Sequence, residues 1–212
     1  MRQIYQDLIQ GSEAWLNLRC GILTMSEIDP LMVDGKDKSG FGVGALTYMN
    51  KLIAERILGK PTDSYSGWQT EMGHADEPII RQLHADRIEQ EIVEVGFITN
   101  HGCGYSPDGL ICIDGAAEYK RKVPHIQCEI ILADEVPKEH YHQCMGGLWV
   151  SEREWIDFVS YSPGLPLFIK RLYRDEAQIK KYAEAAERFY FHLEKRMERI
   201  LNVDLGFSQE AA

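Results

Sequence analysis

The sequence lacks the features of membrane and secreted proteins. No stretch approaches the roughly 18–20 consecutive apolar residues that a membrane-spanning helix needs. The opening segment, MRQIYQDLIQGSEAW, has no apolar core of the kind found in a secretory signal. The chain has 5 cysteines, an odd number, and no CxxC pair. We therefore expect a cytoplasmic protein with reduced thiols, and neither a disulfide framework nor a zinc site.

Positive charge is also scarce in this chain. Lysine and arginine number 23 against 33 aspartates and glutamates, and the formal net charge is −10. Proteins that coat nucleic acid without specificity need a basic surface, so this charge disfavours that class. It does not exclude a DNA enzyme, because a narrow basic channel can attract phosphates locally. Carboxylates that bind a metal also add negative charge, which the cation then offsets.

The organisation of the chain is that of one continuous unit. It has no internal repeat and no low-complexity linker. Its 212 residues are enough for one sizeable domain and few for two. We expect a single domain over residues 1–212, with roughly the last ten residues frayed.

Hydrophobic periodicity predicts the order of helices and strands. Apolar residues at helical spacing indicate a helix within residues 39–61, stopped by Gly59 and Pro61, and further helices over 67–86, 138–150 and 175–201. Alternating or β-branched stretches indicate strands at 91–99, 103–105, 110–113, 116–121 and 154–162. This order predicts a mixed α/β (α+β) fold, in which a mixed central β-sheet is flanked by helices.

The same spacing assigns an apolar face to three of these helices. In the helix within 39–61 the face consists of Leu46, Met49, Leu52, Ile53 and Ile57. In the helix over 67–86 the buried side is expected to carry Ile79, Ile80 and Leu83. In the long C-terminal helix the face consists of Ile179, Tyr182, Ala186, Phe189, Leu193 and Met197.

The segment SPDGLICIDGAAEYK carries the main candidate site. Glu118 and Lys120 lie two residues apart on a predicted strand, so their side chains should point to the same face. The Asp114-Gly115 pair is a strong hairpin signal, and a hairpin there folds this strand back beside the one that starts at Asp108. Two carboxylates and one lysine should therefore converge at one end of the sheet.

These groups suit hydrolysis of a phosphodiester. Carboxylate oxygens bind Mg²⁺ and leave coordination positions for water and phosphate, and the main-chain carbonyl of Tyr119 is a further candidate ligand. The metal polarises the phosphate, while Lys120 can orient the attacking water and offset developing charge. A bare Asp-x(n)-Glu-x-Lys pattern is also common in ordinary turns and exposed strands. The extended SPDG…EYK form is more specific.

Four separated motifs resemble those of one nuclease family. They are AWLNLRCGILTMSEI, MGHADEPII, SPDGLI…EYK and HYHQCMGGLWV, in that order. Together they are similar to the phage lambda exonuclease group, also called YqaJ-type viral recombinases or alkaline exonucleases. This group belongs to the PD-(D/E)XK nuclease superfamily. The resemblance covers most of the chain, from about residue 14 to residue 150, and it implies a PD-(D/E)XK nuclease core.

The resemblance implies a role for each matching residue of the catalytic centre. Asp108 and Glu118 match the metal ligands, and Lys120 matches the catalytic lysine. Glu77 matches a helix glutamate that contributes near the metals, directly or through water. Gln143 matches a glutamine that helps to place the water or the phosphate, although it could equally be an ordinary polar helix residue.

A second set of residues matches the part of the family that grips the DNA end. Arg19 matches the arginine that holds the 5′ phosphate, a task for which its bidentate fork is suited. Ser26 and Ser106 match serines that donate hydrogen bonds to the same phosphate, but serine is also an ordinary helix-cap and turn residue. His140 and His142 point apart if they lie on a helix, so we expect no metal role for them.

The family resemblance also implies an activity and its partners. The expected protein is a Mg²⁺-dependent exonuclease, with Mn²⁺ able to substitute, that acts on double-stranded DNA ends carrying a 5′ phosphate. It would degrade one strand in the 5′-to-3′ direction, release mononucleotides and leave a 3′ single-stranded overhang for a single-strand annealing protein. A homotrimeric ring, no membrane association and a phage or prophage origin in a bacterial host are further implications.

The chain departs from the family directly after the catalytic lysine. Family members usually continue with cysteine and proline, whereas this chain continues with Arg121, Lys122, Val123 and Pro124. The basic run is either a contact to the DNA backbone or a solvated strand end.

Three other activities are compatible with parts of the pattern. One is a PD-(D/E)XK endonuclease, although no base-reading element is recognisable. A Cas4-like nuclease is disfavoured, because its iron–sulfur cluster usually needs cysteines near the C-terminus and this chain has none after Cys144. The third is a noncatalytic DNA-end clamp or scaffold for the annealing protein.

Overall fold

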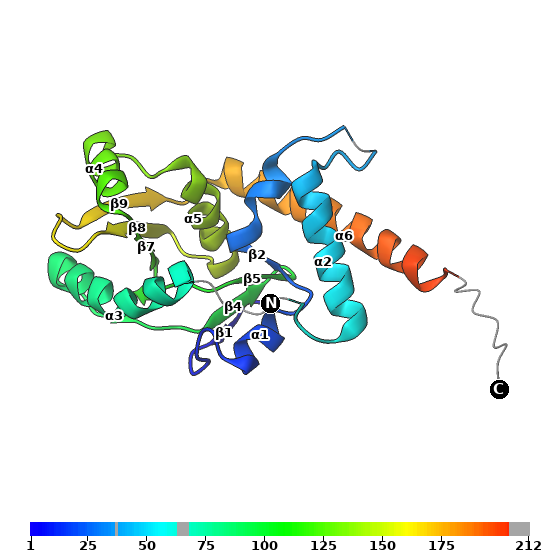
Figure 1. Cartoon of the computed structure of the whole chain (residues 1–212), viewed down its shortest axis with the longest axis horizontal. Helices are drawn as coiled ribbons and strands as arrows, with labels where there is room; N and C mark the ends of the chain where they lie inside the picture. The colour runs from blue at the N-terminus through cyan, green and yellow to red at the C-terminus, as the bar shows by residue number, and fades with distance from the viewer. Residues whose placement is uncertain (37, 63–67, 204–212) are drawn as a thin grey trace.

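The computed structural model describes residues 1–36, 38–62 and 68–203, and its strands form two sheets (Figure 1). The first sheet contains, in spatial order, β1 (Gln3–Tyr5), β4 (Phe97–Asn100), β5 (Cys103–Tyr105) and β2 (Leu23–Thr24). The second contains β3 (Ile92–Val93), β6 (Gly109–Ile111), β7 (Gly115–Arg121), β8 (Trp155–Tyr161) and β9 (Phe168–Tyr173). Each sheet combines parallel and antiparallel pairs, which confirms the predicted mixed sheet.

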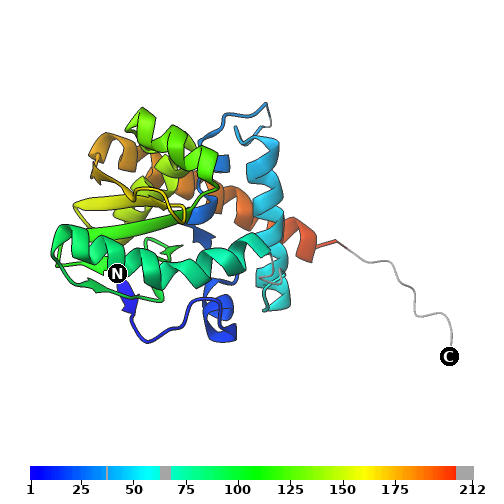
Figure 2. The same cartoon turned by 60° about the vertical axis from the view of Figure 1, so that its left-hand side comes forward.

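Helices cover both sheets. They are α1 (Glu13–Arg19), α2 (Val43–Leu58), α3 (Trp68–Ile88), α4 (Pro124–Ala133), α5 (Lys138–Ser151) and α6 (Glu176–Leu201), with two short 3₁₀ turns, η1 (Met25–Glu27) and η2 (Asp29–Met32). In Figures 1 and 2, α3 runs along one side of the second sheet, while α2 and α6 lie together at the other end of the molecule. No helix in the described part of the chain is both long and apolar enough to cross a bilayer.

The predicted hairpin is present, but its turn lies earlier than Asp114-Gly115, because Gly115 is already the first residue of β7 and pairs with Ile111. Strands β6 and β7 pair antiparallel, with Leu110 opposite Ala116, and residues 112–114 form the turn. Strand β8 then pairs with β7 in parallel, which requires a crossover connection. Helices α4 and α5 supply that crossover. The carbonyl of Asp114 accepts hydrogen bonds from the amides of Glu154 and Trp155, so the turn is also tied to the start of β8.

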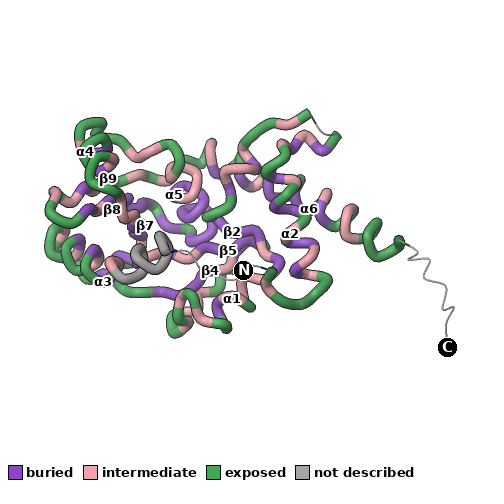
Figure 3. The backbone as a smooth tube through the Cα atoms, in the orientation of Figure 1, coloured by how far each residue is buried: buried purple, intermediate pink, exposed green. Residues whose placement is uncertain are grey.

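Alternation along β7 separates its side chains onto two faces of the sheet. Ala117 and Tyr119 pack with Ile80 of α3 in a small apolar cluster. Ala116 belongs to the main core on the opposite face, which α5 covers. Glu118 points to that same face and contacts α5. Figure 3 shows this arrangement as a buried centre, formed by β7, β8 and most of α5, within exposed outer turns.

The predicted buried side of α3 is wrong for two of its three residues. Ile80 is buried, but the exposed fractions of Ile79 and Leu83 are 49% and 41%. The helix meets β7 and β8 through Ile80 and His84, which lie one turn apart and are both almost fully buried. A polar residue thus occupies the buried stripe, and this displaces the two apolar neighbours towards solvent. The predicted start of this helix, at residue 67, lies outside the described residues.

Most other helix faces match the periodicity. In α2, Met49, Leu52 and Ile53 are buried and Leu46 is partly buried, whereas Ile57, in the last turn, is 41% exposed and lies beyond the buried part of this apolar face. Gly59 ends the helix in the left-handed conformation, at φ 65°. In α6 the predicted apolar face packs on the main core, with Met197 partly buried at its end. The frayed tail predicted for the last residues falls on residues 204–212, outside the described part.

The predicted strand over residues 91–99 is two strands in different sheets. β3 pairs with β6, whereas β4 pairs with β1 and β5. The chain changes sheet at Gly96, whose amide donates to the carbonyl of Tyr5. A Cβ atom at Gly96 would lie 1.9 Å from the carbonyl oxygen of Leu8, so only glycine fits there. The periodicity analysis identified the extended backbone but did not detect this break.

Several elements were not predicted. They are the strands β1, β2 and β9 and the helices α1 and α4. Helix α4 carries proline at its first position, a recognised start signal that could have revealed it. Helix α1 is capped by the Ser12 side chain, which accepts a hydrogen bond from the amide of Trp15.

Candidate functional site

Glu118 is the centre of a group of converging polar side chains. Lys120 Nζ lies 2.7 Å from Glu118 Oε1, so the predicted same-face arrangement of the two residues is confirmed. Gln143 of α5 donates through Nε2 to the same oxygen at 2.5 Å. Tyr105 at the end of β5 donates its hydroxyl to Oε2 at 3.0 Å. Side chains from β7, β5 and α5 therefore hold one carboxylate, which is itself almost fully buried.

Asp108 completes this group from the residue directly before β6. Its Oδ2 accepts a hydrogen bond from the main-chain amide of Tyr119 at 2.5 Å, so it sits beside the peptide between Glu118 and Lys120. Arg81 of α3 donates to the main-chain carbonyl of Asp108 at 3.1 and 3.3 Å. The hairpin thus brings Asp108 against β7, and α3 fixes its backbone from the side.

The electrostatics of this group favour an added cation. Burial, and then the charge of Glu118, raise the pKa of Asp108 well above its ordinary value, while Lys120 opposes the shift. Burial alone would lower the pKa of Lys120, but Glu118 and Asp108 together raise it, so the lysine stays charged. One ammonium group therefore faces two buried carboxylates, and a divalent cation would relieve the remaining repulsion.

The donor set fits magnesium better than zinc. In the described part of the chain, no three histidine, cysteine, aspartate or glutamate side chains gather closely enough to hold a metal ion by themselves. The available protein ligands are the carboxylates of Asp108 and Glu118 and the main-chain carbonyl of Tyr119. Mg²⁺ usually binds through one or two carboxylates and completes its octahedron with waters and substrate phosphates. Glu77 is half-buried on α3, and its charge contributes to the raised pKa of Asp108.

A second polar group forms around Arg19, at the end of α1. Its guanidinium donates to Ser106 Oγ at 3.2 Å and to Ser26 Oγ at 3.5 Å. The same guanidinium lies over the ring of Trp15, 4.0 Å from the ring centroid, and Trp15 Nε1 also donates to Ser106. The structure therefore brings together the three residues of the predicted phosphate-binding set. Ser26 begins no α-helix but lies in the short turn η1.

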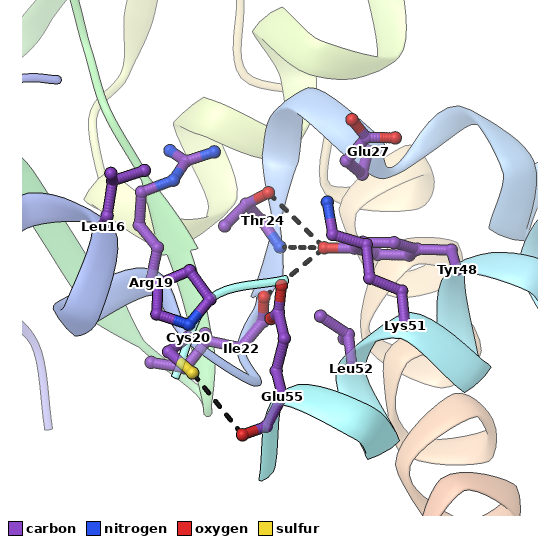
Figure 4. A pocket seen from close by; sticks show the side chains of 11 residues that line it. Leu16, Arg19, Cys20, Ile22, Thr24, Glu27, Tyr48, Lys51, Leu52 and Glu55 are labelled. Carbon is purple, nitrogen blue, oxygen red and sulfur yellow. Dashed lines mark hydrogen bonds between the residues drawn. The ribbon is translucent and has the colours of Figure 1, made fainter. Parts of the chain in front are cut away.

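A cavity of about 170 Å³ opens beside this group (Figure 4). Arg19 and Lys51 line it together with the carboxylates of Glu27 and Glu55. In the figure, the Tyr48 ring forms one wall, and its hydroxyl accepts a hydrogen bond from the Thr24 amide at 3.1 Å. The lining therefore combines charged groups with apolar side chains such as Leu16 and Leu52. The cavity volume is below the roughly 300 Å³ that a drug-sized ligand needs.

A short segment joins the two groups. Tyr105 contacts Glu118, the next residue is Ser106 of the Arg19 group, and Asp108 follows two residues later. The backbone of residues 105–108 therefore fixes the separation between the Glu118 group and the Arg19 group. Sequence analysis did not identify Tyr105 or Arg81. The only signal for Arg81 was its position one helical turn after Glu77.

The two histidines near Gln143 have different surroundings. His140 stacks on Phe158, with ring centroids 5.4 Å apart, and its Nε2 lies 2.7 Å from Lys122 Nζ. Burial, together with Lys122, lowers the pKa of His140 to about 3. His142 instead shares a 2.7 Å hydrogen bond between its Nδ1 and the hydroxyl of Tyr182. Each ring is therefore occupied by separate partners.

The basic run after Lys120 divides between the two faces of the sheet. Arg121 pairs with Asp76 of α3. Lys122 lies on the opposite side and pairs with Glu139 of α5 at 2.7 Å. The run is therefore not a simple solvated end, and its contact with DNA stays a prediction.

Comparison with known proteins places these observations in a family. Residues 14–154 match the family described as the YqaJ-like viral recombinase domain. The chain is similar to the alkaline exonuclease LHK-Exo from Laribacter hongkongensis, with 27% identity and a TM-score of 0.80 over 90% of this chain and 96% of that chain. The structure of LHK-Exo in complex with dAMP gives 28% identity and a TM-score of 0.80, over 89% and 96% of the two chains.

A more distant structure shares the fold alone. A phage-related exonuclease from Haemophilus somnus 129PT has 14% identity and a TM-score of 0.59 over 83% of this chain and 96% of that chain. No curated protein matches. The structural neighbours confirm the predicted PD-(D/E)XK fold, and the family supports a nuclease role and a DNA substrate.

Proposed function

Because this chain belongs to the YqaJ-like viral recombinase family, we propose that it is a Mg²⁺-dependent exonuclease acting on double-stranded DNA in the 5′-to-3′ direction. One observation carries the proposal. The Asp108, Glu118 and Lys120 group is joined to the Arg19 group by residues 105–108. A terminal phosphate held at one group would set the position of the phosphodiester presented to the other.

Each residue of the catalytic group has a task in this reaction. Asp108, Glu118 and the carbonyl of Tyr119 would hold Mg²⁺, which polarises the scissile phosphate and acidifies water. Lys120 is charged, and its ammonium group orients the attacking water and offsets the charge that develops on the phosphate. Gln143 holds Glu118 in place, and Glu77 adds a further carboxylate on the side of α3. Mn²⁺ should substitute for Mg²⁺, because it accepts the same oxygen ligands.

The Arg19 group accounts for the expected polarity. A guanidinium fork binds phosphate through two parallel hydrogen bonds, and the ring of Trp15 holds its plane. The hydroxyls of Ser26 and Ser106 already lie within reach of the guanidinium and would contact the same anion. The LHK-Exo complex with dAMP, a nucleoside monophosphate, supports release of mononucleotides.

We extend the proposal to the consequences of that activity. Removal of one strand leaves a 3′ single-stranded overhang, which a single-strand annealing protein would take up during phage recombination. A homotrimeric ring around the DNA would keep the enzyme on its substrate. Sedimentation analysis of the purified protein tests the ring, since a monomer at working concentration would contradict it.

The decisive experiment uses linear duplex DNA labelled separately at each end, with and without a 5′ phosphate, in the presence of Mg²⁺. We expect mononucleotides from the 5′-phosphorylated end and a rate reduction of roughly 100- to 1,000-fold or more for Lys120→Ala. Lys170→Ala is the matched control, because Lys170 pairs with Asp134 on the surface. Nicking of circular DNA would indicate an endonuclease instead. Binding of DNA ends without cleavage would indicate a clamp.

A further inference from the structure

A buried polar network lies behind the catalytic strand, on the face of β7 opposite Glu118 and Lys120. Its centre is His84 of α3, which is fully buried. The ring Nδ1 lies 3.3 Å from the hydroxyl of Tyr119, and Nε2 lies 3.2 Å from Asp157 Oδ2. Arg171 of β9 donates to both oxygens of Asp157, at 2.8 and 2.9 Å. Side chains from α3, β7, β8 and β9 thus form one continuous chain of hydrogen bonds.

The charges in this network fix its hydrogen-bond directions. Burial would raise the pKa of Asp157, but hydrogen bonds from Arg171 and His84 lower it, so the carboxylate is ionised and only accepts. His84 Nε2–H therefore donates to Asp157. The hydrogen bond between Nδ1 and the hydroxyl of Tyr119 occupies the other ring nitrogen, so both nitrogens of His84 have a partner.

Filling a protein interior with charged side chains usually adds no more stability than filling it with apolar ones. Buried ion pairs are often replaced by well-packed apolar residues without loss of stability, so their presence calls for another explanation. The surroundings of His84 are apolar, since Ile80 of the same helix face packs into the small cluster with Val159. Arg171 meanwhile stacks on Trp155, 3.5 Å from the ring centroid. The explanation lies in the residue at the end of the network.

That residue is Tyr119, which lies between Glu118 and Lys120. Its hydroxyl is held by His84, and its main-chain amide holds Asp108 at 2.5 Å. Arg81, one turn before His84 on α3, holds the carbonyl of Asp108. Helix α3 therefore fixes both strands of the catalytic hairpin, one through the Tyr119 side chain and the other through the backbone of Asp108.

We propose that His84, supported by Asp157 and Arg171, is a positioning residue that fixes the Tyr119 peptide and thereby sets the spacing of the Asp108 and Glu118 carboxylates. This inference rests on the proposed nuclease function. His84 and Asp157 are buried, so they act through Tyr119. The network acts by keeping the two carboxylates and the Tyr119 carbonyl in the geometry that a divalent cation requires, as outer partners of metal ligands do elsewhere.

The test removes one hydroxyl group. Tyr119→Phe keeps the ring, the backbone and every proposed ligand, but it breaks the hydrogen bond to His84. We expect Mn²⁺ binding to the DNA-free protein, followed by electron paramagnetic resonance, to weaken roughly tenfold or more. The kcat for DNA should fall by a similar factor, while KM stays near the wild-type value because DNA contacts are intact.

A matched control separates positioning from ordinary stability. Tyr182 is also buried and also shares a hydrogen bond with a histidine, His142, but it lies on α6 outside the catalytic hairpin. Tyr182→Phe should lower the melting temperature and leave Mn²⁺ affinity unchanged. If Tyr119→Phe behaves in the same way as this control, with Mn²⁺ affinity and kcat within about twofold of wild type, the positioning role is refuted.

A second variant and the wild-type protein complete the experiment. If Tyr119→Phe does not fold, Arg171→Gln takes its place, because Arg171 is partly exposed and its loss leaves Asp157 bonded to His84. Arg171→Gln should also weaken Mn²⁺ binding, and an unchanged Mn²⁺ affinity would overturn the proposal.

A wild-type protein that neither binds Mn²⁺ nor cuts DNA refutes the nuclease proposal itself. A wild-type protein that does both, with unaffected variants, refutes only the positioning role.

Discussion

The role of Arg19 gives the sharpest prediction about substrate choice. The guanidinium is preorganised: it stacks on Trp15 at 4.0 Å and donates to Ser106 and Ser26. Arg19→Lys keeps the positive charge but replaces the planar fork with a single ammonium group. If Arg19 binds the terminal 5′ phosphate through both arms of the fork, the variant should lose one charge-assisted hydrogen bond to that phosphate.

The size of the effect follows from the number of lost contacts. A hydrogen bond to a charged group contributes about 1.5–3 kcal/mol. Because about 1.36 kcal/mol corresponds to a factor of ten, the preference for phosphorylated over hydroxyl ends should fall roughly ten- to a hundredfold. Cleavage of hydroxyl ends should hardly change, since those ends never made the contact.

The assay compares kcat/KM for two duplexes that differ only in the 5′ phosphate. Arg188→Lys is the control. Arg188 also lies over an aromatic ring, that of Phe41, but it belongs to α6 and not to the Arg19 group. An unchanged ratio in Arg19→Lys would refute the phosphate role. An equal loss for both ends would mean that Arg19 contributes general DNA affinity and does not recognise the terminal phosphate.

Three further predictions concern the acidic groups. Asp108→Asn should abolish cleavage and yet raise the melting temperature without metal, because burial and Glu118 make ionisation of Asp108 unfavourable in the folded state. A lower melting temperature would contradict this account. Mg²⁺ at 100 times its Kd should stabilise the wild type by about 2.7 kcal/mol, a rise of roughly 5–10 °C that EDTA reverses and that Asp108→Asn lacks. Asp157 has a lowered pKa, so its contribution to stability is present above the ordinary value of 3.8 and is lost as pH falls through the folded value. The stability of Asp157→Asn should accordingly fall less steeply than that of the wild type as the pH is lowered, as measured by acid denaturation followed by circular dichroism. The same pH dependence in both proteins would refute this.

Local patterns were sufficient to locate the hairpin that carries Asp108, Glu118 and Lys120. Strand alternation put Glu118 and Lys120 on one face, and the hairpin signal at Asp114-Gly115 predicted that Asp108 lies alongside, although the turn itself spans residues 112–114. The resemblance supplied Gln143 and the Arg19 set, which local periodicity does not reveal. The structure brings all of these residues into two adjoining groups.

The apolar pattern failed where tertiary packing chose the buried side. In α3 the periodicity favoured Ile79 and Leu83, but the helix turns His84 towards the sheet because Asp157 and Tyr119 provide its hydrogen bonds there. A buried histidine looks like a surface residue in the sequence alone. The switch of sheets at Gly96 was hidden for a similar reason, since the approach of Leu8 that requires it comes from a distant part of the chain.

The sequence by itself therefore determined the candidate carboxylates and lysine and the strand that carries two of them. Only the tertiary structure decided what holds them: Tyr105 on Glu118, Arg81 on Asp108, and the network from His84 to Arg171. These contacts join residues that are 13 to 73 positions apart. They depend on how the two sheets and α3 pack and on the register of β8 and β9, and no local pattern encodes which polar side chain will find a buried partner across such a separation.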